Sequence, residues 1–252
     1  MIKSYKERSP NGLLEWNFGL VHKVKPLKES SNITSSFEGL PMHFDMVALP
    51  RYMGISQDSH RYEDFVCREF LLYCRQGCSD VNEGQTTFVD AHSAVISMNG
   101  MKIQQWKDIV LQYETQASTG KDKDVYFGGQ GNYYQYPIVQ TCPWTGKDVL
   151  RWLQSWTPEE HPNSRQLGSH KVKSSPFGLE TTSEELESEI CQLAFDKRFY
   201  FGHSYEQGDQ VYVNNYTTLH GRNGFSQMRE LWRIQAVPPS DNLPDYFVKH
   251  SL

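Results

Sequence analysis

The chain has 252 residues, of which 38% are hydrophobic and 13% aromatic, and its net charge is −5 at pH 7. This length can bury one sizeable core, so we expect a single domain over residues 1–252, and the acidic balance argues against nucleic acid or a membrane surface as the partner. No apolar run approaches the roughly 18 residues of a membrane span, and no apolar signal core opens the chain, so we expect a soluble cytoplasmic protein.

Strand patterns dominate both ends of the chain. Alternating or continuous apolar residues predict strands within 20–27, 64–76 and 84–91. The same patterns return within 208–222 and 229–237. Two groups of strands separated by helical insertions predict a mainly β fold, a double-stranded β-helix or jelly roll.

The middle of the chain is different. Residues 93–114 carry apolar residues at near-helical spacing, and an Asn-Gly pair at position 99 divides them into two pieces. The clearest helix lies within 181–198, where Thr182 and Glu185 fit a capping box ahead of an apolar stripe.

Residues 120–175 are rich in Gly, Pro, Lys, Ser and Tyr, which favours an inserted loop or lid over a core layer. Within this insert, 125–144 contains Tyr134 among several aromatic residues that offer ring faces and hydroxyls to a small molecule. A stripe of aromatic residues is more often part of a packed core than a binding surface. If the insert is a lid over a binding site, we expect Tyr134 to contact the substrate.

The stretch LPMHFDM, residues 40–46, places a histidine and an aspartate two positions apart in an apolar run. Residues i and i+2 of a strand share a face, so His43 and Asp45 would project together while Met42 and Phe44 pack behind. An imidazole nitrogen and a carboxylate oxygen would then meet at one point. Such a pair also arises by chance, so a third ligand has to be found.

His220 supplies a candidate third ligand. It closes an apolar strand in VYVNNYTTLHGR, and Gly221 directly after it allows the backbone to turn sharply or approach a ligand closely. Two histidines and one carboxylate form the facial triad that binds non-haem Fe(II) and leaves three positions open. Taken alone, His220 reads more simply as a core or strand-end histidine.

Two arginines follow, four residues apart, in SQMRELWRIQA. On a strand, Arg229 and Arg233 would share a face, and the apolar neighbours Leu231, Trp232 and Ile234 indicate that this strand is buried. A buried arginine needs an anion, and its guanidinium is suited to a carboxylate.

Together, HFD at 43–45, GQTTF at 84–88, LHGR at 219–222 and RELWRI at 229–234 resemble the Fe(II)- and 2-oxoglutarate-dependent oxygenases of the taurine dioxygenase type. The resemblance covers residues 16–95 and 205–237. Within that family, EGQTTFVD and NNYTTLHGRNGF look most like the subgroup that oxidises isocyanide derivatives of tyrosine or tryptophan.

The resemblance implies a role for each matching residue. The iron ligands would be His43, Asp45 and His220, the clamp on the distal carboxylate of 2-oxoglutarate would be Arg229 with Thr86, and a substrate anion would face Arg233. The metal would bind 2-oxoglutarate through its keto group and adjacent carboxylate, which leaves one position for dioxygen. Related halogenases lack the carboxylate ligand, so Asp45 argues against halogenation.

The expected function is therefore oxidation, by hydroxylation or desaturation, of a small amino-acid-derived carboxylate in secondary metabolism, with an isocyanide as one candidate. The alternatives are a free amino-acid hydroxylase of the same family and a non-catalytic jelly-roll binding protein. A mononuclear metal hydrolase would have no use for Arg229. The sequence leaves open whether copies of the chain form a homo-oligomer.

Overall fold

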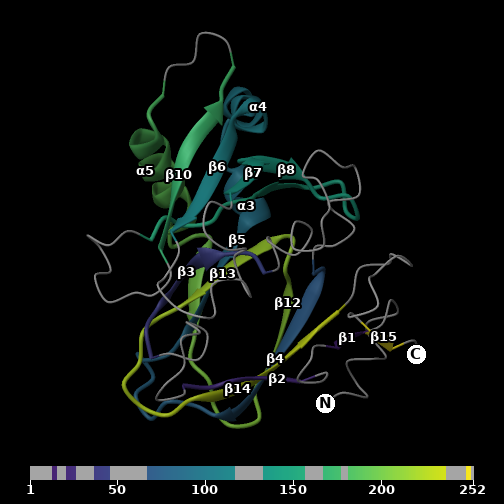
Figure 1. Ribbon diagram of the computed structural model, residues 1–252, viewed down its shortest axis with the longest axis vertical. Coiled ribbons are helices and arrows are strands. Elements are labelled where there is room, and N and C mark those ends of the chain that lie inside the picture. Colours follow the sequence, from purple (N-terminus) through teal and green to yellow (C-terminus); the bar gives the residue numbers. More distant parts are fainter. Residues whose placement is uncertain are drawn as a thin grey trace.

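The computed structural model describes residues 13–15, 21–26, 37–45, 67–116, 133–156, 167–176, 181–236 and 248–250. Two four-stranded antiparallel sheets form its centre, with strand orders β11-β5-β13-β3 and β12-β4-β14-β2. The first sheet consists of β11 (Tyr200–His203), β5 (Thr86–Asp90), β13 (Thr218–Arg222) and β3 (Leu40–His43). The second consists of β12 (Gln210–Asn214), β4 (Glu69–Gln76), β14 (Glu230–Gln235) and β2 (His22–Val24). This pair of sheets is the jelly roll that the sequence predicted (Figure 1).

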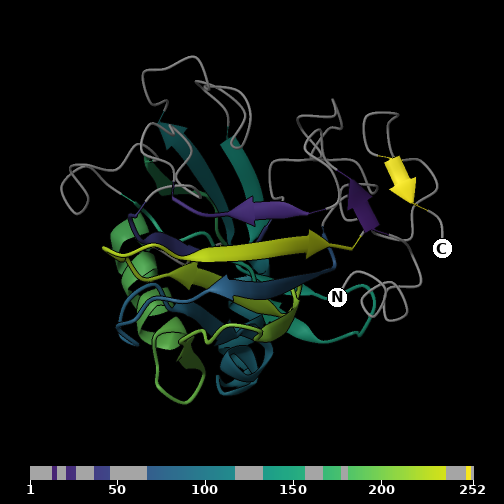
Figure 2. The ribbon, with the colours of Figure 1, turned by 90° about the horizontal axis from the view of Figure 1, so that it is seen from below.

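A second group of elements lies at one end of the jelly roll, the upper part of Figure 1. It contains the sheet β10-β6-β7, which is made of Leu167–Ser174, Val110–Gln116 and Tyr133–Pro137, and the hairpin of β8 (Val139–Thr141) and β9 (Asp148–Leu150). The helices α3 (Ala91–Ile96), α4 (Gly100–Asp108) and α5 (Ser183–Ala194) belong to the same group. A further pair, β1 (Leu13–Glu15) and β15 (Val248–His250), lies at the side near the chain ends (Figures 1 and 2).

The core has two parts that match this division. The smaller cluster fills the space between the two four-stranded sheets and includes Phe70 and Leu72 from β4, Phe88 from β5 and Leu231 from β14. The larger cluster joins the first sheet to the helices and to β6–β9. Because both clusters border the first sheet, its two central strands, β5 and β13, are buried over most of their length.

The two predicted helical regions are confirmed, with one difference. Asn99 caps α4 with its side chain, so the predicted break at position 99 separates α3 from α4, and the capping box of Thr182 and Glu185 opens α5. The expected helical spacing does not continue through 110–114, because these residues form β6, which pairs with β7 on one side and β10 on the other. Pairing on both edges overrides the local helical pattern.

The prediction of a loop or lid is wrong for residues 133–156. Three strands lie within this range, and Tyr136, Ile138, Val149 and Trp152 are fully or almost fully buried in the larger core cluster. These strands pair with β6 or with each other, and that pairing outweighs the Gly- and Tyr-rich composition. The predicted lid residues 125–132 lie outside the described residues, and the single domain over the whole chain remains a prediction.

Within this second group, a buried polar network connects α5 to β7 and β10. The hydroxyl of Tyr136 lies 2.6 Å from His170 Nε2, and His170 Nδ1 lies 2.9 Å from Glu187 Oε2. The Glu187 carboxylate also accepts hydrogen bonds from Trp152 Nε1 and from the Ser155 amide. We call these contacts the Tyr136–His170–Glu187 network.

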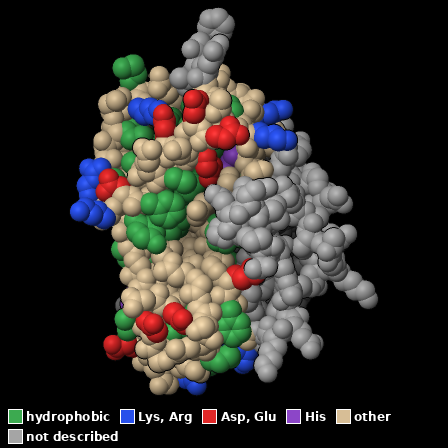
Figure 3. All heavy atoms as spheres, turned by 90° about the vertical axis from the view of Figure 1, so that its left-hand side faces the viewer, with side chains coloured by type: hydrophobic (Ala, Val, Ile, Leu, Met, Phe, Trp, Pro, Cys, Tyr) green, Lys and Arg blue, Asp and Glu red, His purple; other side chains and the backbone are tan. Residues whose placement is uncertain are grey.

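Charged side chains of both signs are mixed on the surface. The face drawn in Figure 3 carries acidic and basic side chains close together, and its described part shows no large area of one sign. Among the described residues, none of the helices has the length and apolar character that a membrane crossing requires.

Candidate active site

The three predicted ligands come together where β3 ends. His43 is the last residue of β3, and the ladder pairs it directly with His220 on β13, so the two imidazole rings lie 4.4 Å apart between centroids. Asp45 follows two residues later and turns back toward both rings. Its Oδ1 lies 3.8 Å from His43 Nε2 and 3.7 Å from His220 Nε2. All three ligand atoms lie within 4.8 Å of one another.

The position of His220 differs from the prediction in one respect. The strand does not close at His220 but continues to Arg222, with Gly221 between them. A Cβ atom at Gly221 would lie 2.8 Å from the carbonyl oxygen of Leu40 and 3.0 Å from Thr87 Oγ1. Glycine at this position therefore allows the neighbouring strands to approach closely, and it is not needed for a turn or for a ligand.

The surroundings of His43 and His220 are compatible with metal binding. His43 Nδ1 lies 2.7 Å from the carbonyl oxygen of Pro41, so it donates there and Nε2 keeps its lone pair toward Asp45. The ring of Phe70 packs 4.8 Å from that of His220 and limits access of water. Burial, followed by the neighbouring His220, lowers the pKa of His43 to about 4. At neutral pH His43 is therefore an uncharged ligand.

Asp45 is ionised in the same environment. Burial alone would raise the pKa of this carboxyl, but the Arg233 guanidinium and His220 outweigh burial and hold the pKa well below its usual range. Its backbone amide donates to Asn215 Oδ1 at 2.8 Å, which fixes the turn after β3. Two imidazole nitrogens with one carboxylate oxygen are the donor set of non-haem Fe(II) sites, so these residues can hold such an ion.

Arg229 and Thr86 meet as predicted, through a hydrogen bond of 2.8 Å from Arg229 Nη2 to Thr86 Oγ1. The hydroxyl of Tyr205 donates to the same Oγ1 at 3.0 Å. Arg229 is 3% exposed, and burial lowers its pKa. Within the described part of the chain, no carboxylate lies within ion-pair distance of Arg229. A buried guanidinium without an internal counter-ion is a site for an anion.

Strand register relates this anion site to the three ligands. On β5, Phe88 pairs with His220 and Thr86 pairs with Arg222. Thr86 therefore lies two residues from the level of His220, about 7 Å along the strand. That separation suits a short dicarboxylate with one end at the three ligands and the other at Arg229.

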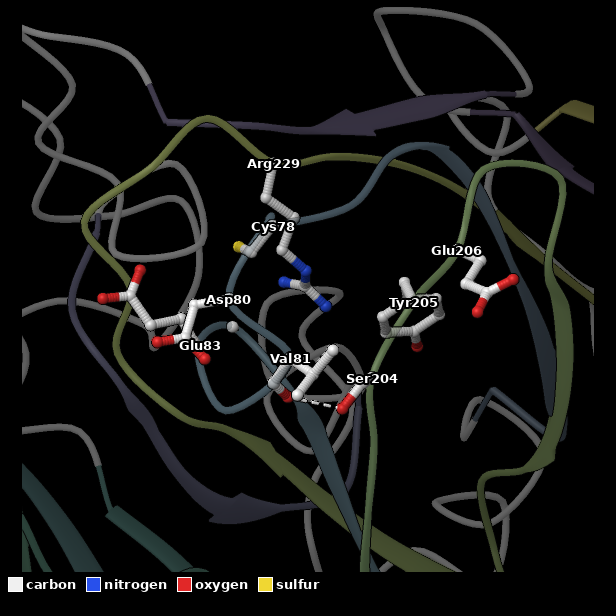
Figure 4. A pocket seen from close by; sticks show the side chains of 9 residues that line it. Cys78, Asp80, Val81, Glu83, Ser204, Tyr205, Glu206 and Arg229 are labelled. Atoms are coloured by element: carbon white, nitrogen blue, oxygen red, sulfur yellow. Dashed lines mark hydrogen bonds between the residues drawn. The ribbon is translucent and has the colours of Figure 1, made fainter.

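A pocket lies at Arg229 (Figure 4). Its empty volume is about 360 Å³, including the part open to solvent. The Arg229 guanidinium points into it beside Tyr205, while Asp80 and Glu83 lie toward one edge and Glu206 toward another. The pocket therefore brings acidic side chains near the buried guanidinium, but none of them lies within ion-pair distance of it in the described part of the chain.

The remaining two predicted contacts have different outcomes. Arg233 lies at the site, but its Nη1 donates to Asp45 Oδ2 at 2.8 Å and its Nη2 lies 3.0 Å from His22 Nδ1. Tyr134 belongs to β7 and pairs with Tyr113, but its side chain lies outside the described residues. A substrate contact by either residue remains a prediction.

Sequence reasoning missed several residues that shape the site. Gln235 Nε2 donates to Asp45 Oδ2 at 3.0 Å, and Asn215 donates to the carbonyl oxygens of Asp45 and Cys67. Arg151 holds the neighbouring turn through the carbonyl oxygens of Asn215 and Tyr216, with its guanidinium 3.5 Å from the centroid of Phe44. Of these residues, only Gln235 could have been suggested by the sequence, because it lies two residues beyond Arg233 on the same strand and therefore shares its face.

Comparison with known proteins gives one family match over most of the chain. Residues 12–235 match the family described as taurine catabolism dioxygenase TauD, TfdA family. Isocyanide synthase xanB of Aspergillus fumigatus is 27% identical over 236 residues, which cover 88% of this chain and 28% of that protein. The 3-((Z)-2-isocyanoethenyl)-1H-indole synthase of Fischerella ambigua is 22% identical, covering 89% of this chain and 73% of that protein.

A solved structure agrees on the fold. PvcB of Pseudomonas aeruginosa superposes with a TM-score of 0.59 at 18% identity, covering 89% of this chain and 66% of that chain. PvcB is described as an Fe, alpha-ketoglutarate dependent oxygenase from an isonitrile synthetic pathway. The chain spans 28% and 36% of the lengths of two isocyanide synthases of Aspergillus fumigatus.

Proposed function

The chain belongs to the taurine catabolism dioxygenase TauD, TfdA family, and from this premise we propose that it is an Fe(II)- and 2-oxoglutarate-dependent oxygenase acting on a small amino-acid-derived molecule. One observation carries the proposal. The cluster of His43, Asp45 and His220 lies two strand residues from a buried Arg229–Thr86 pair. A metal site and an anion site at this separation are what a metal-chelating dicarboxylate requires.

In this proposal His43, Asp45 and His220 hold Fe(II). When bound, Fe(II) together with 2-oxoglutarate and dioxygen supplies an oxidant that can take a hydrogen atom from a C–H bond. The chain contributes two imidazole ligands, of which His43 is neutral, and an ionised carboxylate, so no ligand proton of His43 or Asp45 has to leave at neutral pH. Phe70 shields the His220 side from water.

Arg229 holds the distal carboxylate of 2-oxoglutarate. Its guanidinium has no acidic partner among the described side chains, and Thr86 and Tyr205 fix its direction and add hydroxyl groups. Arg222 lies close enough that burial and Arg229 together lower the pKa of Arg222 to about 9. Two buried guanidinium groups near each other favour occupation by an anion.

The substrate class is proposed from the relatives. Both named relatives are called synthases of isocyanides, and the compound in one of the two names contains an indole ring. We therefore propose an amino-acid-derived carboxylate, with an isocyanide of tyrosine or tryptophan as the first candidate. Arg233 and Tyr134 are the predicted contacts to it.

The test is turnover with purified chain, Fe(II), 2-oxoglutarate and air, with succinate as the measured product. Succinate formation should be stimulated by the isocyanide derivative of tyrosine or tryptophan and less by the free amino acids. Asp45→Ala should abolish it, while Asp108→Ala, an exposed aspartate at the end of α4, should not. Succinate formation that survives Asp45→Ala would contradict the proposed metal site.

A further inference from the structure

The two oxygens of the Asp45 carboxylate have different surroundings. Oδ1 faces the two histidine Nε2 atoms at 3.8 and 3.7 Å. Oδ2 points the other way and accepts hydrogen bonds from Arg233 Nη1 at 2.8 Å and Gln235 Nε2 at 3.0 Å. The carboxylate is thus divided into one oxygen that is free for a metal ion and one that is held by the chain.

We propose that Arg233 is a positioning residue for the metal ligand Asp45, and that with Gln235 it makes the carboxylate bind metal through Oδ1 alone. This inference rests on the proposed function, because it concerns the same metal site. It assigns Arg233 a role other than the predicted contact with a substrate anion.

Strand pairing explains why Arg233 is available for this role. Arg233 and Gln235 are two apart on β14, so both side chains reach the same carboxylate. On the other edge of β14, the ladder pairs Arg233 directly with His22 of β2. His22 Nδ1 lies 3.0 Å from Arg233 Nη2, so it contacts the guanidinium nitrogen that does not bind Asp45 and helps to fix the position of Arg233.

The protonation state of His22 supports this contact. Burial, followed by the adjacent Arg233, lowers the pKa of His22 to about 3, so the ring is neutral and its Nδ1 can accept a hydrogen bond from Arg233. A charged His22 would instead repel the guanidinium. The arginine is therefore held between a neutral acceptor and a carboxylate, with 12% of its side chain exposed.

Binding through one oxygen has a chemical consequence. A six-coordinate ion that takes two imidazoles and one carboxylate oxygen keeps three positions, enough for a chelating oxo acid and dioxygen. If the carboxylate bound the metal through both oxygens, it would occupy one of these three positions. Hydrogen bonds from Arg233 and Gln235 engage Oδ2 and so preserve the third position. Residues that orient metal ligands in this way typically change metal affinity 10- to 100-fold when replaced.

The experiment measures Fe(II) affinity without oxygen, by competition with a chromophoric chelator, for the wild type and four variants. Arg233→Met should bind Fe(II) about 10- to 100-fold more weakly. Arg233→Lys should fall between this variant and the wild type, because it keeps the charge and one donor. Gln235→Met should lose less than Arg233→Met. Arg75→Met is the matched control, since Arg75 is an exposed arginine against Trp232 on the adjacent strand.

Two further readouts separate positioning from a merely structural effect. The visible charge-transfer band of the Fe(II)–2-oxoglutarate complex should shift in Arg233→Met, since the carboxylate would change its binding mode. Thermal unfolding of the metal-free variants checks folding. If Arg233→Met does not fold, Arg233→Lys and Gln235→Met decide the question by the same two measurements.

Wild-type Fe(II) affinity and an unshifted band in Arg233→Met, with a raised KM for an acidic substrate, would overturn the inference and return Arg233 to substrate binding. That result would leave the proposed function intact. A wild-type protein that binds no Fe(II) is a different outcome, since it overturns the proposed function and this inference together.

Discussion

Two buried polar clusters in this molecule differ in how completely the chain satisfies them. In the Tyr136–His170–Glu187 network, both ring nitrogens of His170 have partners and both oxygens of Glu187 accept hydrogen bonds. In the cluster around Asp45, His220 Nδ1, Arg229 Nε and Arg233 Nε are buried without a partner among the described residues. Burying a polar group without a partner is costly, so the cluster around Asp45 is the less completely satisfied of the two.

The comparison separates structure from function. The first network is closed and joins α5 to β7 and β10, so its loss should affect folding. The second is open at Arg229 and at the three proposed ligands, so its loss should affect binding. Replacements in each cluster test this division.

The largest effect should come from Asp45→Ala. It removes the one carboxylate of the proposed metal site, and we expect complete loss of Fe(II) binding and of turnover. The metal-free variant should remain folded, which thermal unfolding can check. Retained Fe(II) affinity would place the metal elsewhere.

His170→Leu tests the closed network. Glu187 would lose its main partner, and His170 together with other groups holds the pKa of Glu187 below its usual range although burial alone would raise it. Glu187 keeps its hydrogen bonds from Trp152 and Ser155, but both Glu187 and the Tyr136 hydroxyl lose their contact with His170. The free energy of unfolding should therefore fall by roughly 3 kcal/mol. Urea unfolding measures it, and the Fe(II) affinity of the folded fraction should equal that of the wild type. An effect on Fe(II) affinity without loss of stability would reverse the assignment.

Arg229→Met tests the open cluster in the opposite sense. It breaks a sheltered arginine–carboxylate contact and should weaken 2-oxoglutarate binding by about 2 kcal/mol, roughly thirtyfold. The free energy of unfolding should not fall, because no internal carboxylate loses a partner. Unchanged 2-oxoglutarate affinity would show that the anion binds elsewhere.

Acid should lower the stability of the folded chain through the two buried histidines His22 and His43. The pKa values of His22 and His43 are lowered to about 3 and 4, against about 6.5 in the unfolded chain. Between these values the unfolded state binds protons that the folded state does not, so stability falls as pH drops from about 6.5 toward 4 and is flat above about 7. Each histidine contributes up to about 1.4 kcal/mol per pH unit. Urea unfolding at pH 5 and 7.5 measures the slope, and His22→Leu should reduce it.

The smallest effect is expected from Thr86→Val. This change keeps the shape of the side chain and removes one hydroxyl partner of Arg229 and Tyr205. The affinity for 2-oxoglutarate should fall by about 1 kcal/mol. A loss as large as that of Arg229→Met would mean that Thr86 contributes more than orientation.

Local patterns explain which features the sequence could predict. The spacing of His43 and Asp45, the capping box at Thr182 and the short apolar runs of β5 and β14 are all visible within a few residues. The pairing of β6 was not visible, because its partner residues on β7 and β10 lie 19 or more positions away in the sequence. The composition of 120–175 likewise obscured the buried strands within it.

Contacts that depend on register could not be predicted from the sequence. Arg229 meets Thr86 as expected, but Arg233 was expected to face a substrate anion, and the pairing of β14 with β2 and β4 places it against Asp45 instead. Asn215 lies in a turn and is positioned by Arg151, far away in the sequence. No local pattern in the sequence indicates either contact.

The central claim is that the open cluster binds Fe(II) and 2-oxoglutarate together. An anaerobic titration of the purified chain with both tests it most directly, through the visible metal-to-ligand charge-transfer band that forms only when the oxo acid chelates the iron. The account predicts a band in the wild type and in His170→Leu, no band in Asp45→Ala, and a band that needs roughly thirtyfold more 2-oxoglutarate in Arg229→Met. A folded wild-type protein that gives no band, or a band that persists in Asp45→Ala, would contradict it.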